Sequence, residues 1–426
     1  MPVRIVVGVN WGDEGKGRSV DYFAKDADYV IRFQGGNNAG HTIENEFGNF
    51  KLHLIPSGIF YKRVVNILGP GTVVNLEAAV KEMNELKKRG IDIDDTNYKI
   101  SDRAVIVFPF HQLQDEYEEE RLGESKFGST KQGIAPVYSD RYLKYGIQVG
   151  AVLHPSYLKE QVVRCLSLKN EIFQKVYERP MFDPDEVYEW AIKYGTILRP
   201  HICDTASLLR KAQKEDSNII LEGQLGALRD INYGIYPFTT SSSTISSYGQ
   251  SGAGCFGKEL PIVTGVMKAF STCVGEGPFT TEIHGDLASQ IRETSFEYGA
   301  ATGRPRRIGW FDAVASKYGV EVSGSTELAL TKLDSLTGLP VLKICTNYLI
   351  GSKSIDYFPI MPELTRVKPK YIELPGWNKD ITDVCEFHKL PAAAQEYVRK
   401  IEELVECNIS YISVGPHREA MIVRNT

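Results

Sequence analysis

The sequence has no run of 18 or more apolar residues, which excludes a helix of ordinary length that spans a membrane. Its first residues, MPVRIVVGVN, lack the charged, apolar and small-residue regions of a secretory signal peptide. Positive charge is not in excess either, because 49 lysines and arginines stand against 54 aspartates and glutamates. A surface for nucleic acid or an anionic membrane requires clustered basic residues. We therefore expect a cytoplasmic protein with small-molecule ligands, and neither nucleic acid nor a membrane as partner.

Cysteine is scarce as well. The 7 cysteines are odd in number and widely scattered, with no CxxC pair and no nearby histidine at metal-ligand spacing. This pattern argues against a disulfide framework and against a structural zinc site. No internal repeat or low-complexity tract is present, so a solenoid or a long disordered tail is disfavoured.

Short, mostly apolar runs recur along the chain between helical patterns and long loops, as buried parallel strands do. They lie at 3–9, 29–33, 64–68, 104–107, 219–221, 262–266 and 341–346. Two segments, 76–86 before Gly90 and 397–405 after Pro391, show helical periodicity with an apolar face. We predict an α/β fold with a large, mostly parallel central sheet flanked by helices, in a single domain that spans 1–426.

The pattern changes between about 110 and 214. Charged helical segments such as QDEYEEERL and DEVYEWAIKYG dominate there, interrupted by a glycine-rich loop at 128–135. We predict a helical subdomain inserted into the α/β body.

The segment WGDEGKG follows the first predicted strand and precedes a helical pattern. Its spacing differs from the usual phosphate-loop motif, because Asn10 stands at the first glycine position and Gly17 at the serine or threonine position. The physical features of such a loop remain. Gly12 and Gly15 have no side chains that would keep a phosphate from the backbone N–H groups, and Lys16 supplies positive charge. The N–H groups that begin the following helix attract anions. These residues alone fit a phosphate loop and an ordinary turn about equally well.

Asp13 lies inside this loop, where a carboxylate repels phosphate unless a cation separates the two. Mg²⁺ bound by one or two carboxylates and by phosphate oxygens is the usual arrangement. A solvated loop residue or a helix cap is the alternative.

His41 lies in FQGGNNAGHT, in a loop with no apolar face to bury it, so a packed core histidine is a weaker explanation than usual. Its imidazole could donate to an oxygen that gains charge during a reaction.

Three further segments carry hydroxyls or positive charge. GSTKQGIAP at 128–136 and YPFTTSSST at 236–244 suit a second phosphate, although such clusters often only form turns. TGRPRR places Arg304 and Arg306 on either side of a proline, and each guanidinium group can donate two hydrogen bonds to a carboxylate or a phosphate. A solvated basic turn is the alternative.

TKLD at 331–334 follows a strand-like ELAL. A lysine and an aspartate at a strand end can hold guanine, because the carboxylate accepts from the ring N–H and from the exocyclic amine. This short motif is weak alone. Together with a phosphate loop it favours GTP over ATP.

Over nearly its whole length the sequence resembles the adenylosuccinate synthetase family. The segments that carry the resemblance are, in order, WGDEGKG, FQGGNNAGHT, LHLIPSGI, GSTKQGIAP, EGQLGALRD, YPFTTSSST, VGEGPFTTE, EYGAATGRPRRIGWFDAVA, TKLD, LPGWNKD and SVGPHR. The resemblance implies a divergent phosphate loop of GTPase-like type and a homodimer. It implies GTP-dependent ligation of L-aspartate to inosine monophosphate (IMP) through a 6-phosphoryl intermediate, with one Mg²⁺ in each site.

The resemblance also implies a role for particular residues. Asp13 would take the proton from N1 of the hypoxanthine and, with the backbone near Gly40, bind Mg²⁺, while His41 would contact the oxygen at C6 and Lys16 the phosphates. The implied GTP contacts are Gly12, Gly15, Lys16, Gly17, Gly40, Thr42, Lys332, Asp334, Ser413 and Gly415. The implied IMP contacts are Asn38, Ser129, Thr130, Lys144, Gln224, Leu225, Thr240 and Arg304. Those for aspartate are Thr302, Arg304 and Arg306.

The chain departs from the family pattern at several positions. Where the family commonly reads EGAQG, with its glutamine on the base, this chain reads EGQLG, so Leu225 takes that position and Gln224 lies one residue earlier. Lys144 stands in place of an arginine that reaches the partner subunit's phosphate, which keeps the charge and loses the bidentate fork. Other departures are Ser129, Cys273 and Ala301.

Two alternatives remain. A relative that acts on another 6-oxopurine nucleotide, such as deoxyguanylate, is associated with loss of the aspartate at position 13, and Asp13 is present. A GTP-binding switch would use the phosphate loop and TKLD, but it has no use for NAGHT, for TGRPRR or for a second phosphate site.

Overall fold

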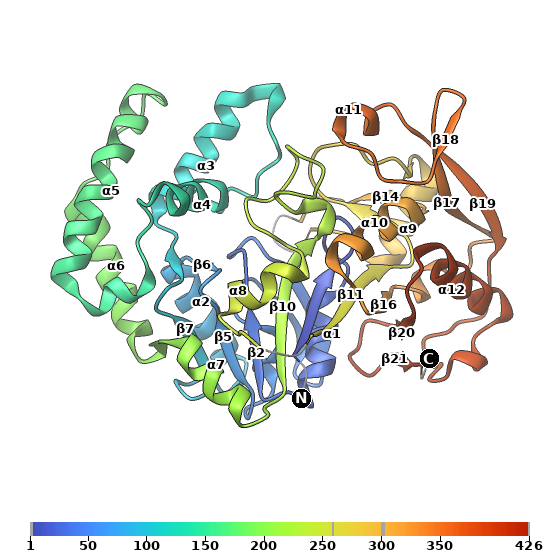
Figure 1. The fold of residues 1–426 in the computed structure, drawn as a ribbon, viewed down its shortest axis with the longest axis horizontal. Helices are drawn as coiled ribbons and strands as arrows, with labels where there is room; N and C mark the ends of the chain where they lie inside the picture. The colour runs from blue at the N-terminus through green and yellow to red at the C-terminus, as the bar shows by residue number, and fades with distance from the viewer. Residues whose placement is uncertain (1–2, 258–259, 300–302, 425–426) are drawn as a thin grey trace.

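A ten-stranded sheet forms the centre of the computed structural model, which describes residues 3–257, 260–299 and 303–424. Neighbouring strands are parallel throughout, except that the edge strand β21 is antiparallel to β20. Their order is β21 (Met421–Val423), β20 (Ile409–Ser413), β16 (Glu327–Thr331), β11 (Ile262–Lys268), β1 (Arg4–Gly8), β10 (Ile219–Gly226), β2 (Tyr29–Arg32), β5 (Val65–Leu68), β7 (Tyr98–Ser101) and β9 (Ile202–Cys203). In Figure 1 the sheet crosses the lower half of the molecule from β7 to β21. The predicted large, mostly parallel sheet is confirmed.

Both faces of this sheet are covered, which explains its uninterrupted apolar strands. On β1, Ile5 and Val7 belong to a buried cluster with Ile31, whereas Val6 belongs to a different cluster with Val20 of the following helix. Alternate side chains of a strand point to opposite faces, so the whole run VRIVV must be apolar or shielded.

The predicted helices are also present. α2 (Leu76–Lys88) begins at Asn75, whose side chain accepts from the N–H of Ala78, and α12 (Ala392–Val405) follows Pro391. α1 (Lys16–Ala24) begins directly after the glycine-rich loop and buries Val20 beneath β1.

Two of the predicted strands lie outside the central sheet. β8 (Val105–Ile106) pairs only with β6 (Val73–Val74) among the named strands that the structure describes. The expectation of a parallel strand at 341–346 was largely wrong. β17 (Val341–Ile350) is antiparallel to β18 (Lys353–Ile355) and β19 (Lys368–Pro375), and parallel only to the two-residue β15 (Phe311–Asp312). An apolar run shows that a strand is buried but does not identify its neighbours.

The charged middle of the chain is mainly helical and carries α3 (Pro109–Leu122), α4 (Ile134–Leu143), α5 (Pro155–Lys175) and α6 (Pro184–Leu198). α5 and α6 lie side by side at the end of the molecule away from β17 and β19 (Figure 1). After them β9 joins the central sheet, and α7 (Thr205–Lys214) leads back to β10. The division of this region into a separate subdomain stays a prediction.

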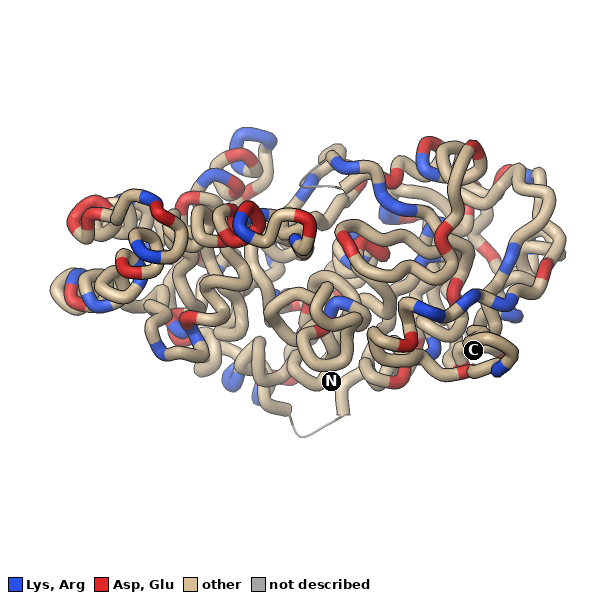
Figure 2. Tube along the Cα trace, turned by 90° about the horizontal axis from the view of Figure 1, so that it is seen from above, with Lys and Arg blue, Asp and Glu red and all other residues tan. Residues whose placement is uncertain are grey.

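Acidic and basic residues are interspersed along the described chain (Figure 2). Within the same ranges, no helix combines the length and apolar content that a bilayer span requires.

Candidate active site

A cavity of about 1010 Å³ lies beyond the carboxyl ends of the central strands. Its walls come from the segments that follow β1, β10, β11, β16 and β20, together with loops from the helical region. In open parallel sheets this edge is the usual place for ligands, because the loops of neighbouring strands meet there.

Most of the predicted site residues line this cavity. They are Asp13, Gly15, Lys16, Gly17, Asn38, Gly40, His41, Thr42, Ser129, Thr130, Gln224, Leu225, Thr240, Arg306, Lys332, Asp334, Ser413 and Gly415. Of the other predicted residues, Gly12 packs beside Leu225, Arg304 is exposed and Lys144 lines a second cavity. Thr302 lies outside the described residues.

The glycine-rich loop has left-handed backbone at three positions. Gly12 and Gly15 have φ of 106° and 95°, which favours glycine, and Asp13 also adopts a positive φ of 60°. α1 begins at Lys16, and its N-cap residue is Gly15, which has no side chain to accept from the first N–H groups of the helix. Gly15, Lys16 and Gly17 all face the cavity. This geometry is that of an anion-binding loop.

Glu14 fixes the conformation of this loop through hydrogen bonds and an ion pair. Its buried carboxylate accepts from the N–H of Gly12 at 2.7 Å and of Asn10 at 3.2 Å, and pairs with Nζ of Lys16 at 2.6 Å. A Cβ at Gly8 would lie 2.5 Å from this carboxylate, so the glycine leaves the space that Glu14 fills. Residue types predicted the positive charge of Lys16 but not its buried partner Glu14.

The expectation that His41 would lie in a loop with no apolar face to bury it was wrong. His41 begins β3 (His41–Asn45), packs closely against Gly17 and is 7% exposed. Its Nδ1 lies 2.6 Å from Oε1 of Glu222, and its buried Nε2 has no hydrogen-bond partner within the described ranges. Burial lowers the pKa of His41 below its ordinary value, partly offset by the charge of Glu222 and its hydrogen bond. His41 thus lines the cavity with unused hydrogen-bonding capacity at Nε2.

Glu222 is the partner that sequence reasoning missed. It is fully buried on β10 and also accepts from the N–H of Ser57 at 2.9 Å and from its Oγ at 2.5 Å. Burial alone would raise the pKa of Glu222, but His41, Arg32 and Ser57 outweigh burial and hold the pKa below its usual range. A glutamate inside an otherwise apolar strand was the available signal, because such a charge needs partners.

Gln224 and Leu225 lie at the cavity wall in different environments. The Gln224 amide nitrogen donates to Oδ1 of Asn38 at 2.8 Å, and its oxygen accepts from Arg32. Leu225 has a positive φ of 58° and packs against Gly12 of the glycine-rich loop. The Gln224 amide is thus held beside Asn38, and an apolar side chain stands next to it.

The loop at 127–129 is held by a carboxylate from α3. Oε1 of Glu119 accepts from the N–H of Phe127 at 3.0 Å, and Oε2 accepts from Gly128 at 2.9 Å and Ser129 at 3.0 Å. Consecutive N–H groups that converge on one anion form a phosphate-binding geometry. In this structure the anion that these groups bind is the Glu119 carboxylate.

The far end of the cavity contains the TKLD and SVGP segments. Oδ1 of Asp334 is buried and has no hydrogen-bond partner in the part of the chain that the structure describes. Burial raises the pKa of Asp334, partly offset by Lys332. Lys332 donates to the Ser295 carbonyl at 2.7 Å, and Ser413 donates to the Gly415 carbonyl at 3.1 Å. Asp334 is the group here with unused acceptor capacity.

Asp13 is the only acidic residue of the predicted catalytic set, and its side chain is 25% exposed at the cavity wall. Its Oδ2 lies 3.0 Å from Nε of Arg306. No group of three or more histidine, cysteine, aspartate or glutamate side chains among the described residues could hold a metal ion. A magnesium ion that takes most ligands from phosphates does not need such a group.

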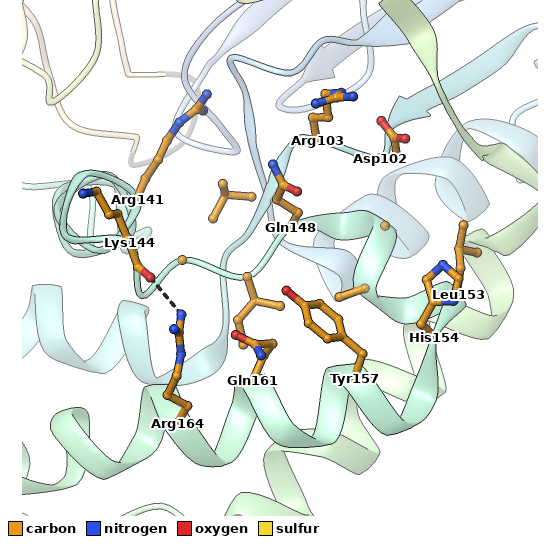
Figure 3. A pocket seen from close by; sticks show the side chains of 15 residues that line it. Asp102, Arg103, Arg141, Lys144, Gln148, Leu153, His154, Tyr157, Gln161 and Arg164 are labelled. Carbon is orange, nitrogen blue, oxygen red and sulfur yellow. Dashed lines mark hydrogen bonds between the residues drawn. The ribbon is translucent and has the colours of Figure 1, made fainter.

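Lys144 lies at a second, separate cavity of about 600 Å³ (Figure 3). It ends α4 with a positive φ of 66°, and its carbonyl accepts from Arg164 at 2.9 Å. Arg103 and Arg141 also line this cavity. The structure therefore does not bring Lys144 together with the other predicted IMP contacts of its own chain.

Comparisons with known proteins identify relatives of this chain. A family model described as adenylosuccinate synthetase matches residues 5–422. Adenylosuccinate synthetase of Caldanaerobacter subterraneus is 45% identical over 424 residues, 99% of each chain, and that of Dehalococcoides mccartyi is 46% identical over 425 residues, the whole of each chain. The structure of fully ligated adenylosuccinate synthetase from Plasmodium falciparum superposes with a TM-score of 0.94 at 33% identity over the whole of both chains. A cyanophage S-2L succinoaminodeoxyadenylate synthetase bound to dGMP and dATP matches with a TM-score of 0.56 at 17% identity, covering 100% of this chain and 96% of that one, a likeness of fold alone.

Proposed function

Since the chain belongs to the adenylosuccinate synthetase family, we propose a role for each wall of its cavity in the reaction of that family. The chain is a GTP-dependent ligase that joins L-aspartate to IMP through 6-phosphoryl-IMP and yields adenylosuccinate, GDP and phosphate. This is the first committed step from IMP to AMP. The observation that carries the proposed roles is the convergence of predicted residues from distant segments on one cavity.

GTP would lie between the glycine-rich loop and the TKLD segment. The first N–H groups of α1 and the charge of Lys16 face the phosphates, together with the backbone of Gly40 and Thr42. Asp334 would accept from the guanine N1–H and exocyclic amine with its unpartnered oxygen. This acceptor explains why GTP rather than ATP fits, since adenine presents no such pair of donors.

IMP would occupy the side of the cavity near the helical region. Asn38, Ser129, Thr130 and Thr240 would bind its phosphate, and the residues at the base would be Gln224 and Leu225. The N–H groups now held by Glu119 would be open to that phosphate once the carboxylate leaves them.

In the first step Asp13 would accept the proton from N1 of the hypoxanthine while O6 attacks the γ-phosphoryl group of GTP. His41 donates its Nδ1–H to Glu222 when neutral, so its Nε2 must take up a proton before it can donate to the phosphoryl oxygens. The ionised Glu222 behind the ring favours that imidazolium, and the arriving phosphoryl charge favours it further.

The second step explains why GTP is used. The amine of aspartate must displace the oxygen at C6, which leaves poorly as hydroxide and readily as phosphate. Thr302, Arg304 and Arg306 would bind the aspartate carboxylates, with Arg304 also near the ribose. Of these, Arg306 lines the cavity beside Asp13.

One Mg²⁺ would fit beside the glycine-rich loop. The partly exposed Asp13 carboxylate and Gly40 both line the cavity where the phosphates would lie, and Mg²⁺ prefers such oxygen ligands. When bound, the ion would neutralise charge between the carboxylate and the phosphates.

We also propose a cytoplasmic homodimer in which Lys144 reaches the partner's site. Lys144 lies away from the main cavity of its own chain, as a residue acting across an interface would. Mixing Asp13→Ala with Lys144→Ala chains tests this, because a hybrid dimer would contain one site with both residues intact. Activity above that of either variant alone is expected, and no gain would refute the role across the interface.

The proposed roles are tested by absorbance during turnover with Mg²⁺, aspartate and either GTP or ATP. IMP, guanylate and deoxyguanylate are supplied separately, and Asp13→Ala is run in parallel. We expect turnover with IMP and GTP alone, lost in Asp13→Ala. Turnover only with a guanine nucleotide would show that Leu225 and its neighbours mark a changed substrate, and full activity of Asp13→Ala would refute the role of that carboxylate.

A further inference from the structure

Four charged side chains form a continuous row along one wall of the main cavity. Nζ of Lys268 lies 2.6 Å from Oε2 of Glu297, and the same oxygen lies 2.5 Å from Nη1 of Arg306. Nε of Arg306 lies 3.0 Å from Oδ2 of Asp13. All four residues line the cavity, but the proposed function gives a role only to Arg306 and Asp13.

The row is most deeply buried at its centre. The side chains of Glu297, Lys268 and Arg306 are 0%, 3% and 9% exposed, whereas that of Asp13 is 25% exposed. Lys268 ends β11 and also donates to Oγ1 of Thr272 at 2.7 Å, which fixes its ammonium group. The more rigid end is therefore Lys268 with Glu297, and the open end is Asp13.

Glu297 remains charged in this setting. Burial alone would raise its pKa, but the charges of Lys268, Arg306 and Lys332 outweigh burial and bring it to about 2. Burial lowers the pKa of Lys268 to about 8, which is partly offset by Glu297. An ionised carboxylate between two buried cations holds Arg306 even when the guanidinium has no contact with Asp13.

The contact with Asp13 lies at the more exposed end of the row. Nε of Arg306 lies 3.0 Å from Oδ2 of Asp13, and the charges of Asp13 and Glu297 outweigh burial and raise the pKa of Arg306. Oε1 of Glu297 is buried without a partner in the described ranges, so the carboxylate has spare acceptor capacity if the guanidinium shifts. Arg306 is thus held by a buried carboxylate at one end and by a partly exposed one at the other.

We propose that Glu297, fixed by Lys268, is a positioning residue that holds Arg306 beside Asp13 and presents it to a carboxylate of substrate aspartate. The inference rests on the proposed function, in which Arg306 binds that carboxylate. A guanidinium that moves to the substrate releases Asp13 from its ion pair. Aspartate binding and the freeing of the proposed base would then be coupled through one side chain.

The neighbouring arginine supplies a matched control. Arg307 is paired with Glu282 by Nε to Oε1 at 2.9 Å and by Nη2 to Oε2 at 2.5 Å, and neither residue lines the main cavity in the part of the chain that the structure describes. Glu282→Gln therefore removes the carboxylate partner of the adjacent arginine, in a more exposed pair, without touching the row.

The experiment measures kcat and the KM for each of aspartate, IMP and GTP in the full-length wild type, Glu297→Gln, Lys268→Met, the double variant and Glu282→Gln. We expect Glu297→Gln to raise the KM for aspartate about 10-fold or more, with the KM for IMP and GTP changed less than about 2-fold. Lys268→Arg keeps the charge beside Glu297 and should restore most of the loss seen in Lys268→Met. Glu282→Gln should resemble the wild type.

Removing Glu297 alone leaves two buried cations, so that variant is checked by thermal unfolding. If it does not fold, the double variant, which removes one charge of each sign, carries the same expectation for aspartate. An unchanged KM for aspartate in a folded variant, or an equal rise for all three substrates, would overturn the inference while leaving the proposed function intact. Failure of the wild type to turn over IMP, aspartate and GTP would overturn both.

Discussion

Nδ1 of His41 lies 2.6 Å from a carboxylate oxygen of Glu222, although the two residues are 181 positions apart in the chain. Both side chains are buried, so the pair is shielded from water and its geometry is fixed from both sides. The carboxylate sets which ring nitrogen carries a proton, and therefore what the nitrogen at the cavity wall can do.

Glu222→Gln is expected to lower kcat by about 10- to 100-fold, because an amide cannot stabilise an imidazolium as a carboxylate does. Ser57→Ala is the control, since it removes one donor to the same carboxylate and leaves the contact with His41. Steady-state kinetics at pH 7 measure both variants. Equal losses in the two would show that the carboxylate acts only through packing.

Asp334→Asn is expected to raise the KM for GTP by about 10-fold or more, since the amide offers one acceptor and one donor where guanine requires two acceptors. Xanthosine triphosphate presents the complementary pattern and should be used better by the variant than by the wild type. Competition between the two triphosphates measures this preference. An unchanged preference for GTP would place the guanine elsewhere.

Glu119→Gln is expected to lower the KM for IMP about 2- to 5-fold, because the carboxylate competes with the nucleotide phosphate for the N–H groups at 127–129. Glu116→Gln, on the same helix, removes an exposed partner of Lys131 and should leave the KM unchanged. A raised KM for IMP in Glu119→Gln would show that the carboxylate supports the loop instead of competing for it.

Asp312 gives a pH dependence of stability. Burial raises its pKa to about 6, although it accepts from the N–H of Ala315 at 3.0 Å and the hydroxyl of Tyr348 at 2.7 Å. The folded protein therefore keeps this proton between pH 4 and 6, where the unfolded chain loses it, so the contribution of Asp312 to stability falls as the pH rises through this range.

Urea unfolding of the wild type and Asp312→Asn between pH 4 and 7 tests this dependence. Relative to the variant, the wild type should lose about 1–3 kcal/mol of unfolding free energy across that range. A difference that stays constant with pH would show that Asp312 is already ionised at pH 4 in the folded protein.

The sequence predicted the local features well. The helices α2 and α12 were found from apolar periodicity and from Gly90 and Pro391, because helix contacts lie three or four residues apart. The glycine-rich loop was found from residue types and from its place after a strand. These features depend on neighbours in the chain, which a sequence displays directly.

The sequence did not predict partners. Burial of His41 was not expected because its loop has no apolar face, and its partner Glu222 lies 181 positions away in the chain. The sheet of β17 was misassigned because a buried apolar strand looks the same whichever strand pairs with it.

The amino-acid sequence by itself determined the fold class and the family, and most of the site residues it predicted line the cavity. The tertiary structure alone decided which charges neutralise one another: Glu14 with Lys16, Glu222 with His41, and Glu297 with Lys268 and Arg306. The physical reason is that a buried charge is stable only beside a counter-charge or hydrogen-bond donors. His41 and Glu222 lie 181 positions apart, and Lys268 and Glu297 lie 29 positions apart, so these two pairs meet only when the tertiary structure forms.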